Sequence, residues 1–164
     1  MKPALLIIDM QKEFFSMSPA CSDSLNSAIE YMNAAIDLFR KEGYPVFVIQ
    51  HKSEEQGLMP GRSGFDVVEG VKLEPQNIHI VKTYGNSFTK TELAEKLREL
   101  KVDTVVITGF CAEFCVLSTY RGAEDFDLKP IMLRSSLASN NSKHIKFIEE
   151  ISEIISYGAL KALL

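Results

Sequence analysis

Short apolar runs alternate along the chain with longer segments in which apolar residues recur every three or four positions. The runs are apolar at most of their positions, which is typical of strands that are buried on both faces of a parallel sheet. They predict strands over residues 4–8, 45–50, 77–81, 102–108 and 129–134.

The segments between the runs have the spacing of amphipathic helices, whose apolar side chains lie on one face. Ser22 or Asp23 is expected to cap a helix of about twenty residues, and Gly43 supplies the stop at its carboxyl end. A later helix is expected to begin at the capping-box pair Thr89 and Glu92.

The last third of the chain continues the alternation of strands and helices. A helix is expected to begin near Cys115, and residues 135–141 have the composition of a polar turn. Another amphipathic helix is expected from Ser142 onward until Gly158 breaks it, with residues 159–164 forming a short last strand or a final turn.

Strands that alternate with helices imply right-handed βαβ units and a parallel sheet that is covered on both faces. We therefore predict one domain over residues 1–164, a doubly wound three-layer α/β sandwich. Its mostly parallel sheet is expected to have about five or six strands in the order 3-2-1-4-5-6. Since no G-x-G-x-x-G motif follows a predicted strand, a Rossmann dehydrogenase is disfavoured.

Composition and charge narrow the class of protein. Hydrophobic residues make up 46% and charged residues 24% of the chain, as in ordinary globular domains. The net charge of −4 argues against a nucleic-acid partner, and no apolar run is long enough for a membrane span. Three cysteines and no signal peptide at Met1 predict a cytoplasmic protein without a disulfide framework.

Three chemically useful side chains follow predicted strands. Asp9 ends the first strand, Lys82 ends the third, and Cys115 lies in the turn after the fourth. The carboxyl ends of parallel strands form one edge of the sheet, where open α/β sheets bind their ligands. A cysteine at the start of a helix is expected to favour its thiolate form. From position alone, Cys115 is equally compatible with a small buried hydrophobic residue, and Cys111 is a second candidate thiol.

These residue types suit nucleophilic catalysis. Cys115 would attack an electrophilic carbon, Asp9 would accept the thiol proton, and Lys82 would supply positive charge that favours both anions. Backbone N–H groups in the turn from Cys111 to Cys115 would hold the developing oxyanion. A water molecule would then release the acyl group.

Three segments together resemble the isochorismatase-like cysteine hydrolases: L-L-I-I-D-M-Q-K-E-F-F, K-T-Y-G-N-S-F-T-K-T-E-L and V-V-I-T-G-F-C-A-E-F-C-V-L-S-T. The resemblance covers nearly the whole chain and implies that Asp9, Lys82 and Cys115 form the catalytic triad. Cys115, rather than Cys111, is the implied nucleophile because it immediately precedes Val116. The resemblance also implies a cis peptide bond between Phe110 and Cys111, and oxyanion donors at the backbone N–H groups of Cys111 and Cys115.

The chain departs from the metal-dependent members of that superfamily. They carry Asp-x-His after the second strand, where this chain has His51-Lys52-Ser53. The resemblance therefore implies no metal and no other cofactor. It also implies a homo-oligomer, a dimer or tetramer. The side chains expected to contact a substrate are Phe14, His51, Phe88 and Phe114.

The presence of the nucleophilic cysteine favours an amide or a related C–N bond as the point of cleavage. The prediction is therefore a small-molecule hydrolase that works through a covalent acyl-enzyme. Two alternatives stay open at this point. One is a catalytically idle small-molecule-binding or regulatory protein on the same fold, and the other is a redox sensor that uses Cys111 and Cys115.

Overall fold

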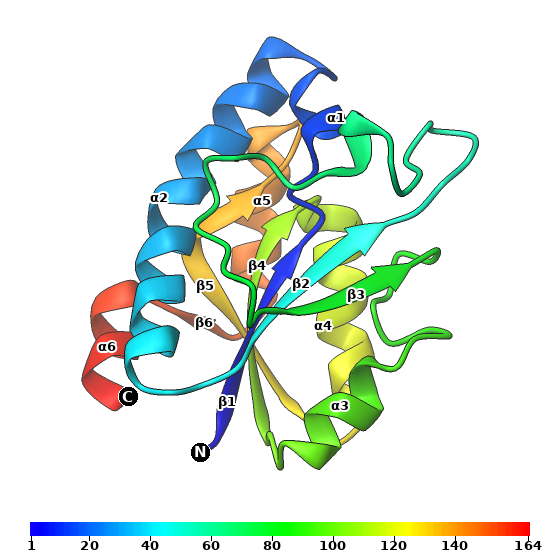
Figure 1. The fold of residues 1–164 in the computed structure, drawn as a ribbon. Helices are drawn as coiled ribbons and strands as arrows, with labels where there is room; N and C mark the ends of the chain where they lie inside the picture. The colour runs from blue at the N-terminus through cyan, green and yellow to red at the C-terminus, as the bar shows by residue number, and fades with distance from the viewer.

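A computed structural model describes all 164 residues and places six parallel strands in one sheet (Figure 1). The strand order is β3-β2-β1-β4-β5-β6, which confirms the predicted fold class and order. The strands are β1 (Pro3–Ile8), β2 (Val46–His51), β3 (Ile78–Lys82), β4 (Thr104–Phe110), β5 (Lys129–Ala138) and β6 (Ile154–Ile155).

Helices cover both faces of the sheet and so complete the three layers (Figure 1). One face is covered by α2 (Pro19–Lys41) and α6 (Tyr157–Leu163). The other face is covered by α3 (Leu93–Glu99), α4 (Leu117–Glu124) and α5 (Ser142–Glu150). The short α1 (Lys12–Phe15) follows β1 at the carboxyl edge of the sheet.

The central strand β1 shows why its sequence is apolar at every position. Leu5 and Ile7 point into the core layer under α2, whereas Leu6 and Ile8 point into the layer under α3, α4 and α5. All four side chains are fully buried, and each contributes about 1.5–3 kcal/mol of hydrophobic free energy. The strand is therefore a rigid support for the residue that follows it, Asp9.

Gly109 allows β4 to lie directly against β1. Its φ is 115°, and a Cβ atom at this position would overlap the backbone of Ile8. Only glycine combines this backbone conformation with so close an approach. Gly109 thus sets the spacing between the strand that ends at Asp9 and the strand that leads to the two cysteines.

Replacing Gly109 with alanine is expected to lower the free energy of unfolding by at least ~3 kcal/mol, because backbone atoms of Ile8 cannot move aside as a side chain can. Urea denaturation measures the change. Gly43→Ala is the matched control: Gly43 also has a positive φ, 74°, but nothing lies within 4 Å of its Cβ position. The control should cost only about 1 kcal/mol, and equal losses in the two variants would refute the role of the close approach.

The starts of two helices differ from the prediction. Helix α2 begins earlier, because Pro19 occupies its first turn and the Ser18 side chain accepts a hydrogen bond from the Cys21 N–H at 3.0 Å. Ser22 and Asp23 therefore lie inside the helix. The predicted capping box at Thr89 is wrong, since α3 begins at Leu93 and no side chain caps it at the preceding residue.

The chain after residue 134 also differs from the prediction. Strand β5 continues to Ala138 instead of turning at residue 135. The chain passes through an irregularity there: Ser135 has a φ of 66°, and the pairing of β5 with β4 shifts its register before the strand continues. Helix α5 ends at Glu150, and Ile154–Ile155 form the edge strand β6. Gly158 lies inside α6 and does not end a helix.

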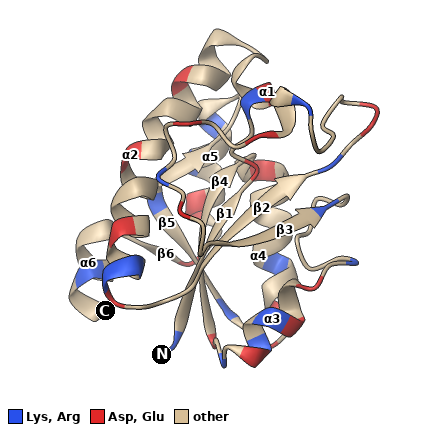
Figure 2. Cartoon of the chain, in the orientation of Figure 1, with Lys and Arg blue, Asp and Glu red and all other residues tan.

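Acidic and basic segments are interspersed over α2 and α3 (Figure 2), in agreement with the small net charge of −4. None of the helices combines the length and the apolar composition that crossing a bilayer requires. The homo-oligomer implied by the resemblance stays a prediction.

Candidate active site

The three residues expected at the carboxyl edge of the sheet come together there. Lys82 Nζ donates a hydrogen bond to Asp9 Oδ2 at 2.8 Å, and the two side chains are 0% and 1% exposed. An Asp9 carboxylate oxygen, a His51 ring nitrogen and Cys115 Sγ lie within 4.8 Å of one another. The site thus gathers a carboxylate, an imidazole and an ammonium group from the ends of β1, β2 and β3, and a thiol from the turn that follows β4.

The parallel register explains how Lys82 reaches Asp9 from two strands away. His51 and Lys82 are paired residues at the ends of β2 and β3, and Lys82 Nζ lies 3.2 Å from His51 Nδ1. The long lysine side chain passes His51 and ends at the carboxylate that follows β1.

Asp9 has an unusual backbone conformation for an aspartate, with a φ of 52°. Its N–H donates to the carbonyl of Ile49 at 2.9 Å, so the residue is held against β2 as the chain leaves the sheet. Left-handed non-glycine residues cost about 1 kcal/mol or more and cluster at functional sites. The carboxylate Oδ1 is buried and has no hydrogen-bond partner. A thiol that donates to this oxygen would satisfy it.

Cys115 lies in a single π-helical turn, Ala112–Val116, which connects β4 to α4. The Val116 N–H donates to the carbonyl of Cys111 at 3.2 Å and closes this wide turn. The peptide bond between Phe110 and Cys111 is cis, at the position that the resemblance implied. Cys115 is partly exposed, whereas Asp9 and Lys82 are buried. Of these three residues, only Cys115 is therefore accessible from outside the protein.

Burial determines the ionisation of the site. It raises the pKa of the Cys115 thiol to about 12. The nearby Asp9 charge raises this pKa further, and the opposing effect of the Lys82 charge is smaller. Burial likewise raises the pKa of the Asp9 carboxyl, although Lys82 opposes that rise. The expectation that the turn favours a thiolate at Cys115 is therefore wrong for the free protein, because it neglected the loss of solvation. In the free protein the Cys115 thiol therefore lies beside a carboxyl group whose basicity burial has increased.

At about pH 8, iodoacetamide is expected to alkylate Cys115 far more slowly than an ordinary cysteine. A pKa of about 12 in place of 9.0 lowers the thiolate fraction about 1,000-fold. Mass spectrometry of the Cys115 peptide measures the rate, with the urea-unfolded protein as the control. The rate should still be rising above about pH 10, and a plateau below about pH 9 would contradict the assignment.

A second hydrogen-bonded cluster surrounds Cys111. Its Sγ donates to Glu113 Oε2 at 3.0 Å, and Ser139 Oγ donates to Glu113 Oε1 at 2.9 Å. His144 Nδ1 lies 2.6 Å from the same Oε1. Burial, with Glu113 as the next cause, raises the pKa of Cys111 to about 12. Because Cys111 bonds to Glu113 and Cys115 lies beside Asp9, the two thiols are held by separate carboxylates, which disfavours a redox couple.

Gln11 and the partners of Cys111 in this cluster were not predicted from the sequence: Glu113, Ser139 and His144. The Gln11 side chain is fully buried and pairs with the backbone of His51: its Oε1 accepts from the N–H at 2.7 Å, and its Nε2 donates to the carbonyl at 2.9 Å. Gln11 lies two residues after Asp9, and Glu113 lies two residues before Cys115. That proximity was the only signal available in the sequence.

The aromatic residues expected to contact a substrate separate into two groups. Phe114 is 65% exposed beside Cys115, and Phe14 is partly exposed and packs on Phe110 with 4.9 Å between ring centroids. Phe88 is only 4% exposed and belongs to the hydrophobic core, where its outer face stacks on the exposed ring of Phe126, with the centroids 5.1 Å apart. The expectation for Phe88 is therefore corrected: its ring serves packing and is left out of the candidate site.

The donor set of Asp9, His51 and Cys115 does not suit a divalent metal ion. Lys82 Nζ already lies 2.8 Å from the Asp9 carboxylate and 3.2 Å from His51 Nδ1. A second cation among these atoms would be repelled at short range in a buried site. The ammonium group of Lys82 thus takes the position that a metal ion would need.

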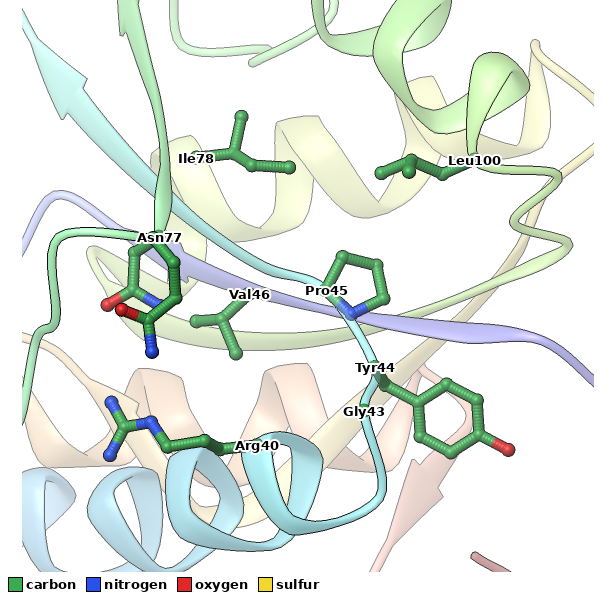
Figure 3. Close-up of a pocket in the computed structure, with 9 residues that line it drawn as sticks. Arg40, Gly43, Tyr44, Pro45, Val46, Asn77, Ile78 and Leu100 are labelled. Atoms are coloured by element: carbon green, nitrogen blue, oxygen red, sulfur yellow. The ribbon is translucent and has the colours of Figure 1, made fainter.

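A separate cavity of about 330 Å³ lies at the opposite, amino edge of β2 and β3. Figure 3 shows its apolar side chains, among them Ile78 and Leu100, above the guanidinium of Arg40. Arg40 is already paired with Glu74 at 2.9 Å. The lining contains no cysteine, serine, histidine or carboxylate, so this cavity offers no nucleophile or base for hydrolysis.

Known proteins share sequence similarity with most of this chain. Residues 3–157 match the family model described as the isochorismatase domain. The isochorismatase family protein YrdC of Bacillus subtilis is 31% identical over 140 residues, which cover 84% of this chain and 74% of that protein. Nicotinamidase 3 of Arabidopsis thaliana is 29% identical over 136 residues, or 73% of this chain and 65% of that protein.

Solved structures share the fold over nearly the whole chain. An isochorismatase-like hydrolase from Alkaliphilus metalliredigens has a TM-score of 0.90 at 22% identity and covers 99% of each chain. N-carbamoylsarcosine amidase from Thermoplasma acidophilum has a TM-score of 0.83 at 23% identity, with 96% of this chain and 97% of that chain covered. The pyrazinamidase of Pyrococcus horikoshii, in complex with zinc, has a TM-score of 0.79 at 21% identity, with 95% and 99% covered.

Proposed function

This chain belongs to the isochorismatase family and has its hydrolase fold, and from that premise we propose that it cleaves an amide or related C–N bond of a small molecule through a covalent acyl-enzyme at Cys115. The observation that carries the proposal is the buried Asp9–Lys82 ion pair beside the partly exposed Cys115 thiol. A buried ion pair is costly to maintain and contributes little net stability. Its position next to a nucleophile favours a role in catalysis.

In the first half of the reaction, Cys115 Sγ attacks the carbonyl carbon of the substrate and its proton passes to the Asp9 carboxylate. The high pKa of the thiol requires such a base, and burial raises the pKa of Asp9 toward that task. The C–N bond then breaks, and Asp9 returns the proton to the departing nitrogen. Lys82 keeps the carboxylate oriented through its 2.8 Å hydrogen bond.

The negative charge that develops on the substrate oxygen needs hydrogen-bond donors. We assign this role to the backbone N–H groups of Cys111 and Cys115, in the turn that follows the cis peptide bond. In other hydrolases each such donor contributes about 3–4 kcal/mol to transition-state stabilisation. A water molecule, deprotonated by Asp9, then attacks the thioester, and the thiol of Cys115 is restored.

Relatives named for amide substrates indicate which compounds to try first. They include the nicotinamidase, the pyrazinamidase and the N-carbamoylsarcosine amidase. Release of ammonia from nicotinamide, pyrazinamide and N-carbamoylsarcosine tests the proposal directly. We expect at least one of these compounds, or another small amide of a wider panel, to be hydrolysed. Hydrolysis that persists unchanged in Cys115→Ala would overturn the proposal.

A further inference from the structure

His51 is held more firmly than a residue at the end of a strand usually is. Both its backbone N–H and its carbonyl are bonded to the side chain of Gln11, at 2.7 and 2.9 Å. The next residue, Lys52, donates its N–H to the carbonyl of Lys82 at 2.7 Å. The imidazole therefore projects from a backbone that is fixed both to Gln11, between β1 and α1, and to β3.

The contact with Lys82 determines which ring nitrogen carries the proton. Lys82 Nζ lies 3.2 Å from His51 Nδ1, and an ammonium group has donors only. Nδ1 must therefore accept the hydrogen bond, which places the ring proton on Nε2. Burial, and then the Lys82 charge, lowers the pKa of His51, so the ring is neutral at neutral pH.

The Nε2–H group has no partner within the protein. None of the side-chain hydrogen bonds of the chain involves His51 Nε2, and the ring is half-buried at the site. A ring nitrogen of His51 lies within 4.8 Å of Cys115 Sγ. The His51 ring thus carries an unpaired donor and lies beside the nucleophile. Such a ring is suited to bind a ligand acceptor, because small-molecule sites use a few polar groups of this kind for orientation.

We propose that His51 is a specificity residue whose Nε2–H donates a hydrogen bond to a second acceptor on the substrate, apart from the scissile amide. The substrate class is then a small amide that carries an additional carbonyl, carboxylate or heteroaromatic ring nitrogen. This inference rests on the proposed hydrolase function. It adds to that function the chemical feature by which this protein distinguishes one amide from another.

The three pyridinecarboxamide isomers and benzamide form a matched set of probes, because they differ in shape only by the replacement of a ring C–H with an acceptor nitrogen. We expect the best isomer to exceed benzamide by about 10–100-fold in kcat/KM, since an unpaired buried donor penalises the analogue that lacks the acceptor. Because the kcat/KM of the best isomer is divided by that of benzamide, any effect common to both substrates cancels in this ratio. Equal rates for all four compounds would overturn the proposal.

Two variants of His51 separate its contact with the substrate from its contact with Lys82. His51→Phe removes both ring nitrogens and should reduce the kcat/KM ratio of the best isomer to benzamide to about one, whatever it does to the absolute rates. His51→Gln can place an amide N–H near the position of Nε2 and should keep part of the preference. A ratio that survives in His51→Phe would assign the preference to another residue.

Binding and spectroscopy test the inference separately from turnover. In Cys115→Ala, the best pyridinecarboxamide should bind about ten-fold more tightly than benzamide, and equal affinities would count against His51. Nitrogen-15 NMR of the histidine rings should show His51 protonated at Nε2, and a proton at Nδ1 would contradict the argument. If the affinities are equal and the ring proton is at Nδ1 while amides are still hydrolysed, only the role of His51 is refuted. Loss of hydrolysis for every amide, with both results as expected, refutes the proposed function instead.

Discussion

Replacing Cys115 with alanine is expected to lower kcat/KM for any amide substrate by at least about 10⁴-fold. The covalent route requires the sulfur, and the remaining groups offer only binding and oxyanion stabilisation. Because Cys115 is partly exposed, the fold should survive with a loss of stability of only about 1 kcal/mol. Steady-state kinetics and thermal unfolding on the same preparation measure both quantities.

Cys21→Ala is the matched control for that experiment. Cys21 is a free cysteine that is fully buried in α2 and makes no hydrogen bond to Asp9, Lys82 or Cys115, so its truncation removes a thiol of the same size from the core and leaves these three groups in place. The control should retain activity within a factor of about three, while it loses more stability than Cys115→Ala does. A Cys115→Ala protein that keeps more than about a tenth of its activity would exclude the nucleophilic role.

Replacing Asp9 with asparagine should affect turnover and thiol reactivity in opposite directions. Turnover should fall by about 10²–10⁴-fold, because the amide cannot accept the thiol proton. Alkylation of Cys115 by iodoacetamide should become faster, since the Asp9 charge contributes to the raised pKa of the thiol and Lys82 favours the thiolate. Slower alkylation in Asp9→Asn would indicate that the carboxylate activates the thiol in the resting protein.

The same substitution also tests what the ion pair contributes to stability. Asp9→Asn leaves the fully buried Lys82 ammonium without its counter-charge, so a loss of about 3–5 kcal/mol is expected. Replacing both residues with apolar side chains, Asp9→Leu with Lys82→Met, should restore most of this loss while activity stays absent. A double variant as unstable as the single one would show that the pair stabilises the fold in its own right.

The placement of Asp9, Lys82 and Cys115 could be predicted because it follows from the sheet. In a parallel sheet every strand ends at one edge, and the apolar runs before Asp9 and Lys82 identify those strands without tertiary information. The edge strand Ile154–Ile155 could not be found in this way. It has only two residues and continues the apolar spacing of the preceding helix.

Other features depend on distant partners that a local pattern does not reveal. The Glu113–Ser139 and Glu113–His144 contacts join residues 26 and 31 positions apart. The ionisation of Cys115 was predicted in the wrong direction, because the helix-start argument considered charges and left out burial. The tautomer of His51 likewise depends on Lys82, which lies on the neighbouring strand.

The most direct test of covalent catalysis at Cys115 is to look for the acyl-enzyme itself. Wild-type protein is mixed with an excess of an amide that it hydrolyses, quenched in acid within the first turnover, and analysed by intact mass and peptide mapping. We expect a mass increase equal to the acyl group, located at Cys115 and absent from Cys115→Ala. Product formed within that first turnover with no adduct at any quench time, or with the adduct on Cys111, would contradict it.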